Sequence, residues 1–428
     1  MHSRSDFTIA SVIARLNIGG PAIQAVLATD ALRRKGYRPL LLTGQVPAGE
    51  GSMEYLARDR QVAPIKIASM SRRISWYDDL TTFGALVRIF YREKPAVVHT
   101  HTAKAGTLGR LAAMATGVPI RVHTFHGHVF QGYFPSSVTR IFLRVERFLA
   151  RHTDCIVAIS ESQKRELVEV YRIAPAAKVA VIPLGIDLDP YLKVNGRDGT
   201  LRDSLGCKGK TCVVGWVGRL VPIKDPALFL ASAGRLVRDS QDLRFALIGD
   251  GELRKACEVQ AAEAGLGKVV HTMGWRQHLD RIYADLDLVV LSSINEGTPV
   301  ALLEAMASAR AFVSTDIGGV RDLMVGSPKK QDGFEIFENG ILVPRDAEVL
   351  ARAIAFLMEN PQLRTAMGQV GRSFVQARFS CQRLADDLEF LYLSLARSKK
   401  NLTVEAQAMA SGISARAPER GADGKGLS

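Results

Sequence analysis

The chain has 428 residues, of which 47% are hydrophobic and 23% are charged, and its formal net charge is +13. This length predicts two or three domains, and this composition excludes a disordered or fibrous protein. No apolar run reaches the roughly 18 residues of a membrane span, no secretory leader opens the chain, and the five cysteines form no CxxC pair, so we expect a cytoplasmic protein.

The excess of lysine and arginine implies an anionic partner, which could be nucleic acid, acidic lipid or a phosphate-bearing substrate. The sequence contains no helix-turn-helix, zinc-finger or aromatic RNA-binding motif. We therefore expect no nucleic-acid partner, and the charge leaves acidic lipid and phosphate-bearing substrates open.

Strands and helices alternate through the first part of the chain. Strands are predicted over residues 8–13, 38–43, 96–101, 120–124, 155–160 and 179–183, and helices over 22–35, 80–92, 105–116, 137–151 and 163–171. This alternation is typical of a doubly wound parallel sheet, which binds ligands at the carboxyl ends of its strands. Gly19 and Gly20 follow the first strand, where a turn without side chains lets the backbone approach a phosphate closely.

Three histidines fall at the carboxyl ends of two predicted strands: His101, His126 and His128. Histidines spaced as His-x-His could bind a metal ion, but no acidic or cysteine partner accompanies either pair. We therefore predict no metal site here, and these side chains are left as candidates for lining a ligand cleft.

The predicted helix over residues 137–151 carries four arginines at intervals of three and four, which places Arg140, Arg144, Arg147 and Arg151 on one face. An ordinary solvated surface would explain this pattern. Attachment to an anionic membrane, which would make the protein peripheral on the inner face, would explain it equally well.

A second series of strands is predicted over residues 212–217, 244–249, 269–275, 288–291, 311–315 and 340–344, after a charged, glycine-containing boundary at 193–210. Gly218, Arg219 and Lys224 follow the first of these strands, and Gly249 ends the second. Two cations five residues apart are suited to binding a diphosphate.

The most informative stretch runs from the strand at 288–291 into a loop with Glu296, Gly297 and Thr298, and then into a helix opened by Pro299. A strand, a loop and a helix N-terminus in that order form an anion site. Glu304 lies in the helix, roughly 12 Å along its axis from Glu296. Cooperating carboxylates lie about 5 to 9.5 Å apart, so these two would instead hold the ends of one long ligand with an anion in its middle.

The run Glu296-Gly-Thr-Pro-Val-Ala-Leu-Leu-Glu304 resembles the glutamate, seven residues, glutamate signature of the retaining glycosyltransferases of family 4. The resemblance covers essentially the whole chain up to its tail and implies a GT-B fold, in which two Rossmann-like, doubly wound parallel-sheet domains face a cleft. It implies an acceptor-binding domain over 1–190, a nucleotide-sugar-binding domain over 191–375, and a last helix over 376–397 that returns to the first domain. Residues 398–428 lack periodicity, and we expect a disordered tail there.

The resemblance also implies roles for individual residues. His126 would contact the donor sugar, with His128 as the second candidate. Arg219 and Lys224 would hold the phosphates of the donor, Glu296 would bind sugar hydroxyls and Glu304 the ribose. The remaining donor-binding positions would be Gly19, Gly20, Gly218, Gly249, Gly297, Thr298 and Pro299, with His101 and His128 lining the acceptor cleft. This chain departs from the family pattern at Arg321-Asp322, where a Pro-Glu pair is usual, and the departure leaves the donor sugar open.

The implied activity is transfer of a sugar from a nucleotide diphosphate, most often UDP in this family, to an acceptor hydroxyl with retention of configuration. A lipid-linked acceptor in polysaccharide or glycolipid assembly fits the family and the basic helix. No metal or other cofactor is expected, and we interpret Asp187-Leu-Asp189 and Asp285-Leu-Asp287 as structural or solvated. The alternatives are a nucleotide-sugar 2-epimerase, a synthase of the glycogen or sucrose type, and a non-catalytic nucleotide-sugar-binding protein.

Overall fold

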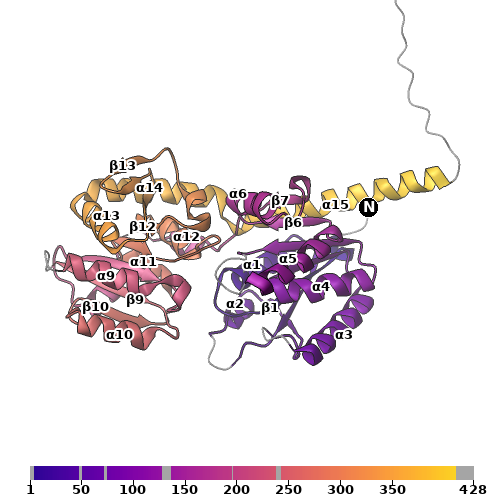
Figure 1. Ribbon diagram of the computed structural model, residues 1–428, viewed down its shortest axis with the longest axis horizontal. Helices are drawn as coiled ribbons and strands as arrows, with labels where there is room; N and C mark the ends of the chain where they lie inside the picture. The colour runs from indigo at the N-terminus through magenta and orange to yellow at the C-terminus, as the bar shows by residue number, and fades with distance from the viewer. Residues whose placement is uncertain are drawn as a thin grey trace, which may run out of the picture.

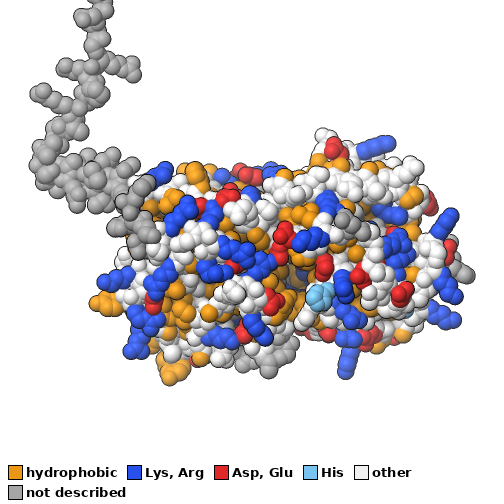
Figure 2. Space-filling model, turned by 180° about the vertical axis from the view of Figure 1, so that it is seen from behind, with side chains coloured by type: hydrophobic (Ala, Val, Ile, Leu, Met, Phe, Trp, Pro, Cys, Tyr) orange, Lys and Arg blue, Asp and Glu red, His pale blue; other side chains and the backbone are white. Residues whose placement is uncertain are grey.

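The computed structural model describes residues 4–47, 51–71, 75–127, 136–194, 196–237 and 242–410. Two α/β lobes lie side by side, and the last helix runs along the N-terminal lobe (Figure 1). Lys and Arg side chains are scattered over both lobes on the face seen in Figure 2, with no single continuous track. Within the described ranges, no helix is both long enough and apolar enough to cross a membrane.

The N-terminal sheet has seven strands in the order β3-β2-β1-β4-β5-β6-β7, and every pair is parallel. Its strands are β1 (Thr8–Arg15), β2 (Arg38–Gly44), β3 (Ile65–Lys66), β4 (Val97–His101), β5 (Ile120–Phe125), β6 (Cys155–Ala158) and β7 (Val179–Val181). The helices are α1 (Gly20–Arg34), α2 (Glu54–Asp59), α3 (Trp76–Glu93), α4 (Ala103–Ala115), α5 (Ser136–Arg151) and α6 (Glu161–Arg165), which continues as a π-helix over Glu166–Val170.

The C-terminal sheet has eight strands in the order β10-β9-β8-β11-β12-β15-β14-β13. Its strands are β8 (Cys212–Val217), β9 (Leu243–Ile248), β10 (Val270–Gly274), β11 (Leu288–Leu291), β12 (Phe312–Thr315), β13 (Lys329–Gln331), β14 (Phe334–Ile336) and β15 (Gly340–Val343). The helices are α7 (Asp189–Leu192), α8 (Thr200–Ser204), α9 (Pro226–Leu236), α10 (Arg254–Glu263), α11 (Leu279–Asp285), α12 (Val300–Ala307), α13 (Ala347–Glu359), α14 (Pro361–Arg378) and α15 (Cys381–Ala410). Strands β13 and β14 pair antiparallel, and the sequence did not predict them.

Parallel sheets must be covered on both faces, and the apolar runs of this sequence meet that need. All four residues of β11 are buried, and Trp216 of β8 is fully buried, with its indole N–H donating to Ser292 Oγ at 2.9 Å. Two extensive apolar clusters, one containing Val214 and Val290 and the other Val213 and Val289, fill the C-terminal lobe. Two doubly wound sheets, as predicted, are therefore confirmed.

Helix α15 begins where the two lobes meet, with Arg383 donating to the carbonyl oxygens of Pro183 and Leu184, and packs on the N-terminal lobe (Figure 1). Leu384, Leu388 and Tyr392 are buried in one cluster with Ile9 and Val97 of the N-terminal sheet. The helix runs on to Ala410, past residue 397 where we predicted its end. Residues 398–410 are rich in strong helix formers, which extend a helix without any apolar periodicity. The rest of the predicted tail, 411–428, lies outside the described residues.

Candidate active site

Two adjoining hollows lie where the carboxyl ends of the two sheets meet. The first has a volume of about 400 Å³ and the second about 320 Å³. Of the predicted site residues, the first hollow is lined by Gly19, Gly20, His126, Arg219, Lys224, Glu296, Gly297 and Thr298. The second is lined by Gly19, Gly20, Gly218, Arg219, Lys224, Gly249, Glu296, Thr298 and Glu304. One continuous cleft therefore collects most of the predicted residues from both lobes.

Three predicted residues stand apart from this lining. Pro299 lines neither hollow and instead immediately precedes α12. His101 is only 2% exposed and also lines neither hollow. His128 lies outside the described residues.

Glycines let the two lobes touch at the start of α12. A Cβ atom added to Gly20 would lie 3.4 Å from Val300 Cγ2, and one added to Gly297 would lie 2.8 Å from the carbonyl oxygen of His126. The second distance is too short for any side chain. The turn after β1, the loop after β5 and the N-terminus of α12 are consequently held together at one point of the cleft.

The two predicted cations, Lys224 and Arg219, differ in their contacts. Lys224 forms an ion pair with Glu296, whose Oε1 also accepts a hydrogen bond from Ser293 Oγ at 2.7 Å. Arg219 is exposed, and its guanidinium has no hydrogen-bond or ion-pair partner among the described residues. A phosphate entering the cleft would thus meet one free cation and a second that must be shared with Glu296.

Glu304 is 9% exposed and lies beneath the second hollow among tyrosines. Burial raises the pKa of Glu304 to about 7, although hydrogen bonds from Tyr191 and Tyr283 oppose the shift. The Tyr283 hydroxyl donates to Glu304 Oε2 at 3.0 Å. This carboxyl group is therefore about half ionised near neutral pH, and further hydrogen-bond donors from a ligand would favour its charged form.

His126 ends a chain of hydrogen bonds that crosses three neighbouring strands. Ser11 Oγ lies 3.1 Å from His101 Nε2, and His101 Nδ1 lies 2.9 Å from His126 Nε2. Burial lowers the pKa of His101 to about 4, and burial followed by the charge of His101 lowers the pKa of His126 well below its usual value. Both rings are therefore neutral at physiological pH, and each carries a single N–H.

The protons in this series of hydrogen bonds can be assigned by counting donors. Ser11 has no other hydrogen-bond partner in the described part of the chain, so the arrangement that uses its hydroxyl proton has Ser11 donating to His101 Nε2. In this arrangement His101 donates from Nδ1 to His126 Nε2, which places the proton of His126 on Nδ1. No residue that the structure describes forms a hydrogen bond with that buried nitrogen, and His126 lines the first hollow. His126 thus offers a neutral hydrogen-bond donor for a ligand.

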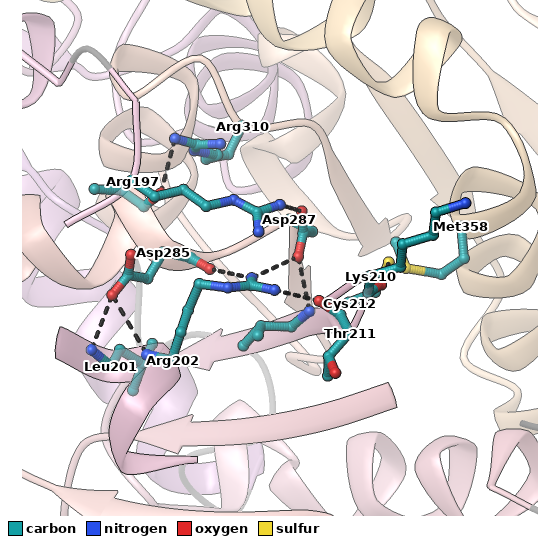
Figure 3. A network of polar contacts seen from close by, with 12 residues as sticks. Arg197, Leu201, Arg202, Lys210, Thr211, Cys212, Asp285, Asp287, Arg310 and Met358 are labelled. Atoms are coloured by element: carbon teal, nitrogen blue, oxygen red, sulfur yellow. Dashed lines mark hydrogen bonds and ion pairs between the residues drawn. The ribbon is translucent and has the colours of Figure 1, made fainter. Parts of the chain in front are cut away.

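The two aspartates at 285 and 287, which mimic a metal-binding motif, are structural (Figure 3). Asp285 accepts hydrogen bonds from the backbone N–H groups of Gly199 at 2.6 Å and Leu201 at 2.8 Å. Asp287 accepts from Arg202 at 3.0 Å, and from Arg197 and the Val213 N–H. All four carboxylate oxygens bind protein donors, so this motif anchors the boundary segment to the C-terminal sheet.

Asp187, the first aspartate of the other such pair, forms an ion pair with Arg60. In the described ranges, no three side chains of His, Cys, Asp or Glu gather in a way that could hold a metal ion.

Sequence reasoning missed several residues of the cleft. Tyr55, Tyr191 and Tyr283 surround Glu304 from three distant segments, and Ser11 sits inside an apolar strand. A serine at a strand position that should be apolar is a weak signal for a buried hydrogen bond, whereas the scattered tyrosines gave no signal.

Comparisons with known proteins agree with this geometry. The model of Glycosyltransferase Family 4 matches residues 18–190, and that of Glycosyl transferases group 1 matches residues 211–360. A UDP-Gal:alpha-D-GlcNAc-diphosphoundecaprenol alpha-1,3-galactosyltransferase of Escherichia coli is 29% identical over 80% of this chain and 86% of its own length. A D-inositol 3-phosphate glycosyltransferase of Saccharomonospora viridis is 30% identical over 69% of each chain.

Solved structures show the same fold. Anabaena HepE in complex with UDP aligns with a TM-score of 0.72 at 20% identity, covering 91% of this chain and 99% of that one. Sucrose-phosphate synthase from Thermosynechococcus elongatus aligns with a TM-score of 0.76 at 21% identity, covering 92% of this chain and 100% of the other. Two facing α/β sheets with the cleft between them define a protein of the GT-B fold. Within that fold class, the chain belongs to glycosyltransferase family 4, with a group 1 C-terminal half.

Proposed function

We propose that this glycosyltransferase moves a sugar from a UDP-sugar, with retention of configuration, to a hydroxyl group of a lipid-linked acceptor in polysaccharide or glycolipid assembly. One observation carries the proposal. Arg219, Lys224 and Glu304 surround the cleft at the start of α12, and His126 faces them from the other lobe.

The second hollow has the groups that a nucleoside diphosphate requires. Glu304 would accept hydrogen bonds from ribose hydroxyls, and Arg219 and Lys224 would neutralise the phosphates beside the free N–H groups of α12. The names of two relatives support UDP as the nucleotide, since Anabaena HepE was crystallised with UDP and the Escherichia coli relative is named for UDP-Gal. We therefore assign the donor to residues 191–375 and the acceptor to residues 1–190.

Negative charge develops on the diphosphate as the bond to the sugar breaks. Arg219 and Lys224 would stabilise that charge, which is the interaction that most lowers the barrier in such a step. Lys224 is shared with Glu296 before substrate binds, so the phosphate would draw Lys224 away and leave Glu296 to bind sugar hydroxyls. Positive charge from these two side chains is sufficient in principle, so we propose that no metal ion is needed.

The exposed face of α5 supports an acceptor at an anionic membrane. Arg140, Arg144 and Arg151 are exposed on this helix, and beside them Ile141 is 61% exposed and Phe148 is 49% exposed. An exposed basic stripe next to an exposed apolar stripe is typical of helices that lie on a membrane surface.

The other charged residues of α5 point elsewhere. Arg147 donates to the carbonyl oxygen of Tyr171 at 2.7 Å, so the predicted stripe of four arginines is reduced to three. Glu146 is buried in an ion pair with Arg110 at 2.7 Å. No acidic side chain of the described part of α5 therefore weakens its basic face.

The direct test is to incubate the protein with a panel of nucleotide sugars and glycosides and to follow nucleotide release and product stereochemistry by NMR. We expect a UDP-sugar to be converted into a glycoside when an acceptor is present, and into the free sugar when water takes the place of the acceptor. The anomeric configuration should be retained in both products. Interconversion of the sugar without an acceptor would instead identify a 2-epimerase. Tight binding of UDP without turnover of any donor would identify a non-catalytic binding protein.

A further inference from the structure

The wall of the first hollow that belongs to the N-terminal lobe carries buried polar groups that form no hydrogen bond with any residue of the described ranges. Thr102 follows β4 and Gln163 lies in α6 after β6, on either side of the His126 loop after β5. Thr102 Oγ1, His126 Nδ1 and Gln163 Nε2 are each buried without a hydrogen-bond partner among the described residues, and all three residues line the same hollow. Unsatisfied buried polar groups are rare, and three around one cavity indicate a missing polar ligand.

The amide of Gln163 is held in one orientation. Gln163 is 5% exposed, and its Oε1 accepts a hydrogen bond from the Ile159 N–H at 2.9 Å. The backbone N–H of Gln163 in turn donates to Ser160 Oγ at 3.1 Å. The amide cannot flip without losing the bond to Ile159, so its NH₂ group is left to donate to an oxygen of a ligand.

Thr102 occupies a strained backbone conformation, with φ 65° and ψ 158° at the start of α4. β-branched residues rarely adopt positive φ, because Cβ then crowds the backbone. Such strain is most often found at functional sites. Its hydroxyl group can both donate to and accept from a ligand.

Charge on this wall selects the kind of ligand. Glu146, held by Arg110, and Glu166 both line the hollow from the N-terminal lobe. Among the described residues of that lobe, the lining includes no lysine or arginine. The cations of the cleft, Arg219 and Lys224, come from the opposite lobe. This wall therefore offers polar groups but no cation, which favours a neutral ligand rich in hydroxyl groups over an anionic one.

We propose that Thr102 and Gln163 form the subsite for the acceptor sugar, and that this subsite takes a neutral pyranose whose hydroxyl groups bind the Gln163 amide, the Thr102 hydroxyl and Glu146. The inference rests on the proposed transferase function, since it assigns the remaining half of the same cleft. An acceptor that carried a carboxylate on this sugar would find no lysine or arginine among the described residues of this wall to bind it.

The test uses the full chain loaded with UDP and four probes: the methyl glycosides of glucose, galactose, N-acetylglucosamine and glucuronic acid. Saturation-transfer NMR measures binding of each probe, and donor hydrolysis and UDP affinity are measured separately. We expect at least one neutral glycoside to bind and the glucuronide to bind at least tenfold more weakly.

Two substitutions test the residues. Thr102→Val keeps the shape of the side chain and removes the hydroxyl group, whereas Gln163→Glu keeps the acceptor for the Ile159 N–H and removes the N–H donor. Each should weaken glycoside binding about five- to tenfold, as the loss of one hydrogen bond does, and leave UDP affinity unchanged. Thr107→Val and Gln260→Glu, outside the lining of both hollows, are the matched controls.

The proposal is overturned if UDP-loaded protein binds no neutral glycoside, if the glucuronide binds best, or if both site variants bind glycosides as the wild type does. A variant that fails to fold would be recognised by lost UDP affinity, and the other variant would then decide. Failure of wild-type protein to bind UDP at all would instead contradict the proposed function.

Discussion

The pKa of about 7 at Glu304 makes nucleotide binding depend on pH. A carboxylate accepts two ribose hydroxyls, whereas the protonated acid does not, so ligand binding should require loss of this proton. At pH 6 only about a tenth of the carboxyl groups are ionised, so the Kd for a UDP-sugar should be about tenfold higher than at pH 8. Titration calorimetry across this range measures the effect.

The ligand in this experiment must be a UDP-sugar, because a terminal phosphate titrates with a pKa of about 6 and would add its own pH dependence. Glu304→Gln is the control, since the amide cannot ionise and its Kd should hardly change between pH 6 and pH 8. A flat profile for the wild type, or an equal slope for Glu304→Gln, would refute the assignment of Glu304 to the ribose.

The same pKa shift predicts that the stability of the folded protein depends on pH in the opposite direction to nucleotide binding. The folded-state pKa lies above the ordinary value of 4.5, so ionisation of Glu304 is less favourable in the folded protein. Its contribution to stability is greatest below the unfolded pKa and is lost as pH rises from about 4.5 to 7. At pH 8, Glu304→Gln should therefore stabilise the ligand-free protein by up to about 3 kcal/mol in thermal or urea unfolding.

Three further outcomes are expected. Arg219→Ala should lower kcat about 100-fold while the Kd for UDP changes less, because Arg219 stabilises charge that develops in the transition state; steady-state kinetics and calorimetry would expose a purely ground-state role as a change in Kd alone. Ser11→Ala should lower kcat/KM about tenfold and shift the proton of His126 between its nitrogens, which ¹⁵N NMR reports; an unchanged spectrum would contradict the hydrogen-bond chain. Phe148→Ser combined with Arg144→Gln should abolish sedimentation with anionic vesicles, and undiminished binding would remove α5 from the membrane contact.

Elements with strong local signals were predictable from the sequence. Strands β8 and β11 match their predicted ranges to the residue, since both are buried apolar runs with clear polar or glycine boundaries. The hairpin of β13 (Lys329–Gln331) and β14 was missed because Lys329 and Lys330 are exposed and the strands are only three residues long. An edge strand of this kind carries little apolar patterning for sequence reasoning to detect.

The site residues likewise include some that the sequence predicted and some that it did not. The loop from Glu296 to Thr298 and the cations Arg219 and Lys224 stand out because each follows a predicted strand, and the structure places them around one cleft. Partners across space were not accessible, because the pairing of Ser11 with His101 joins positions 90 residues apart and depends on strand order.

Contacts in the structure show what Arg321 and Asp322 do at the position where the sequence departs from the family pattern. Asp322 accepts hydrogen bonds from the Ser162 hydroxyl at 2.8 Å and from the Ser162 N–H at 3.1 Å, so it joins the C-terminal lobe to the start of α6 in the other lobe. Arg321 pairs with Asp316 and, at 3.0 Å, with Glu335. Both replacements are therefore occupied in holding the lobes and the adjacent loop, and because Ser162 precedes Gln163, this contact also fixes the helix from which the proposed acceptor subsite is built.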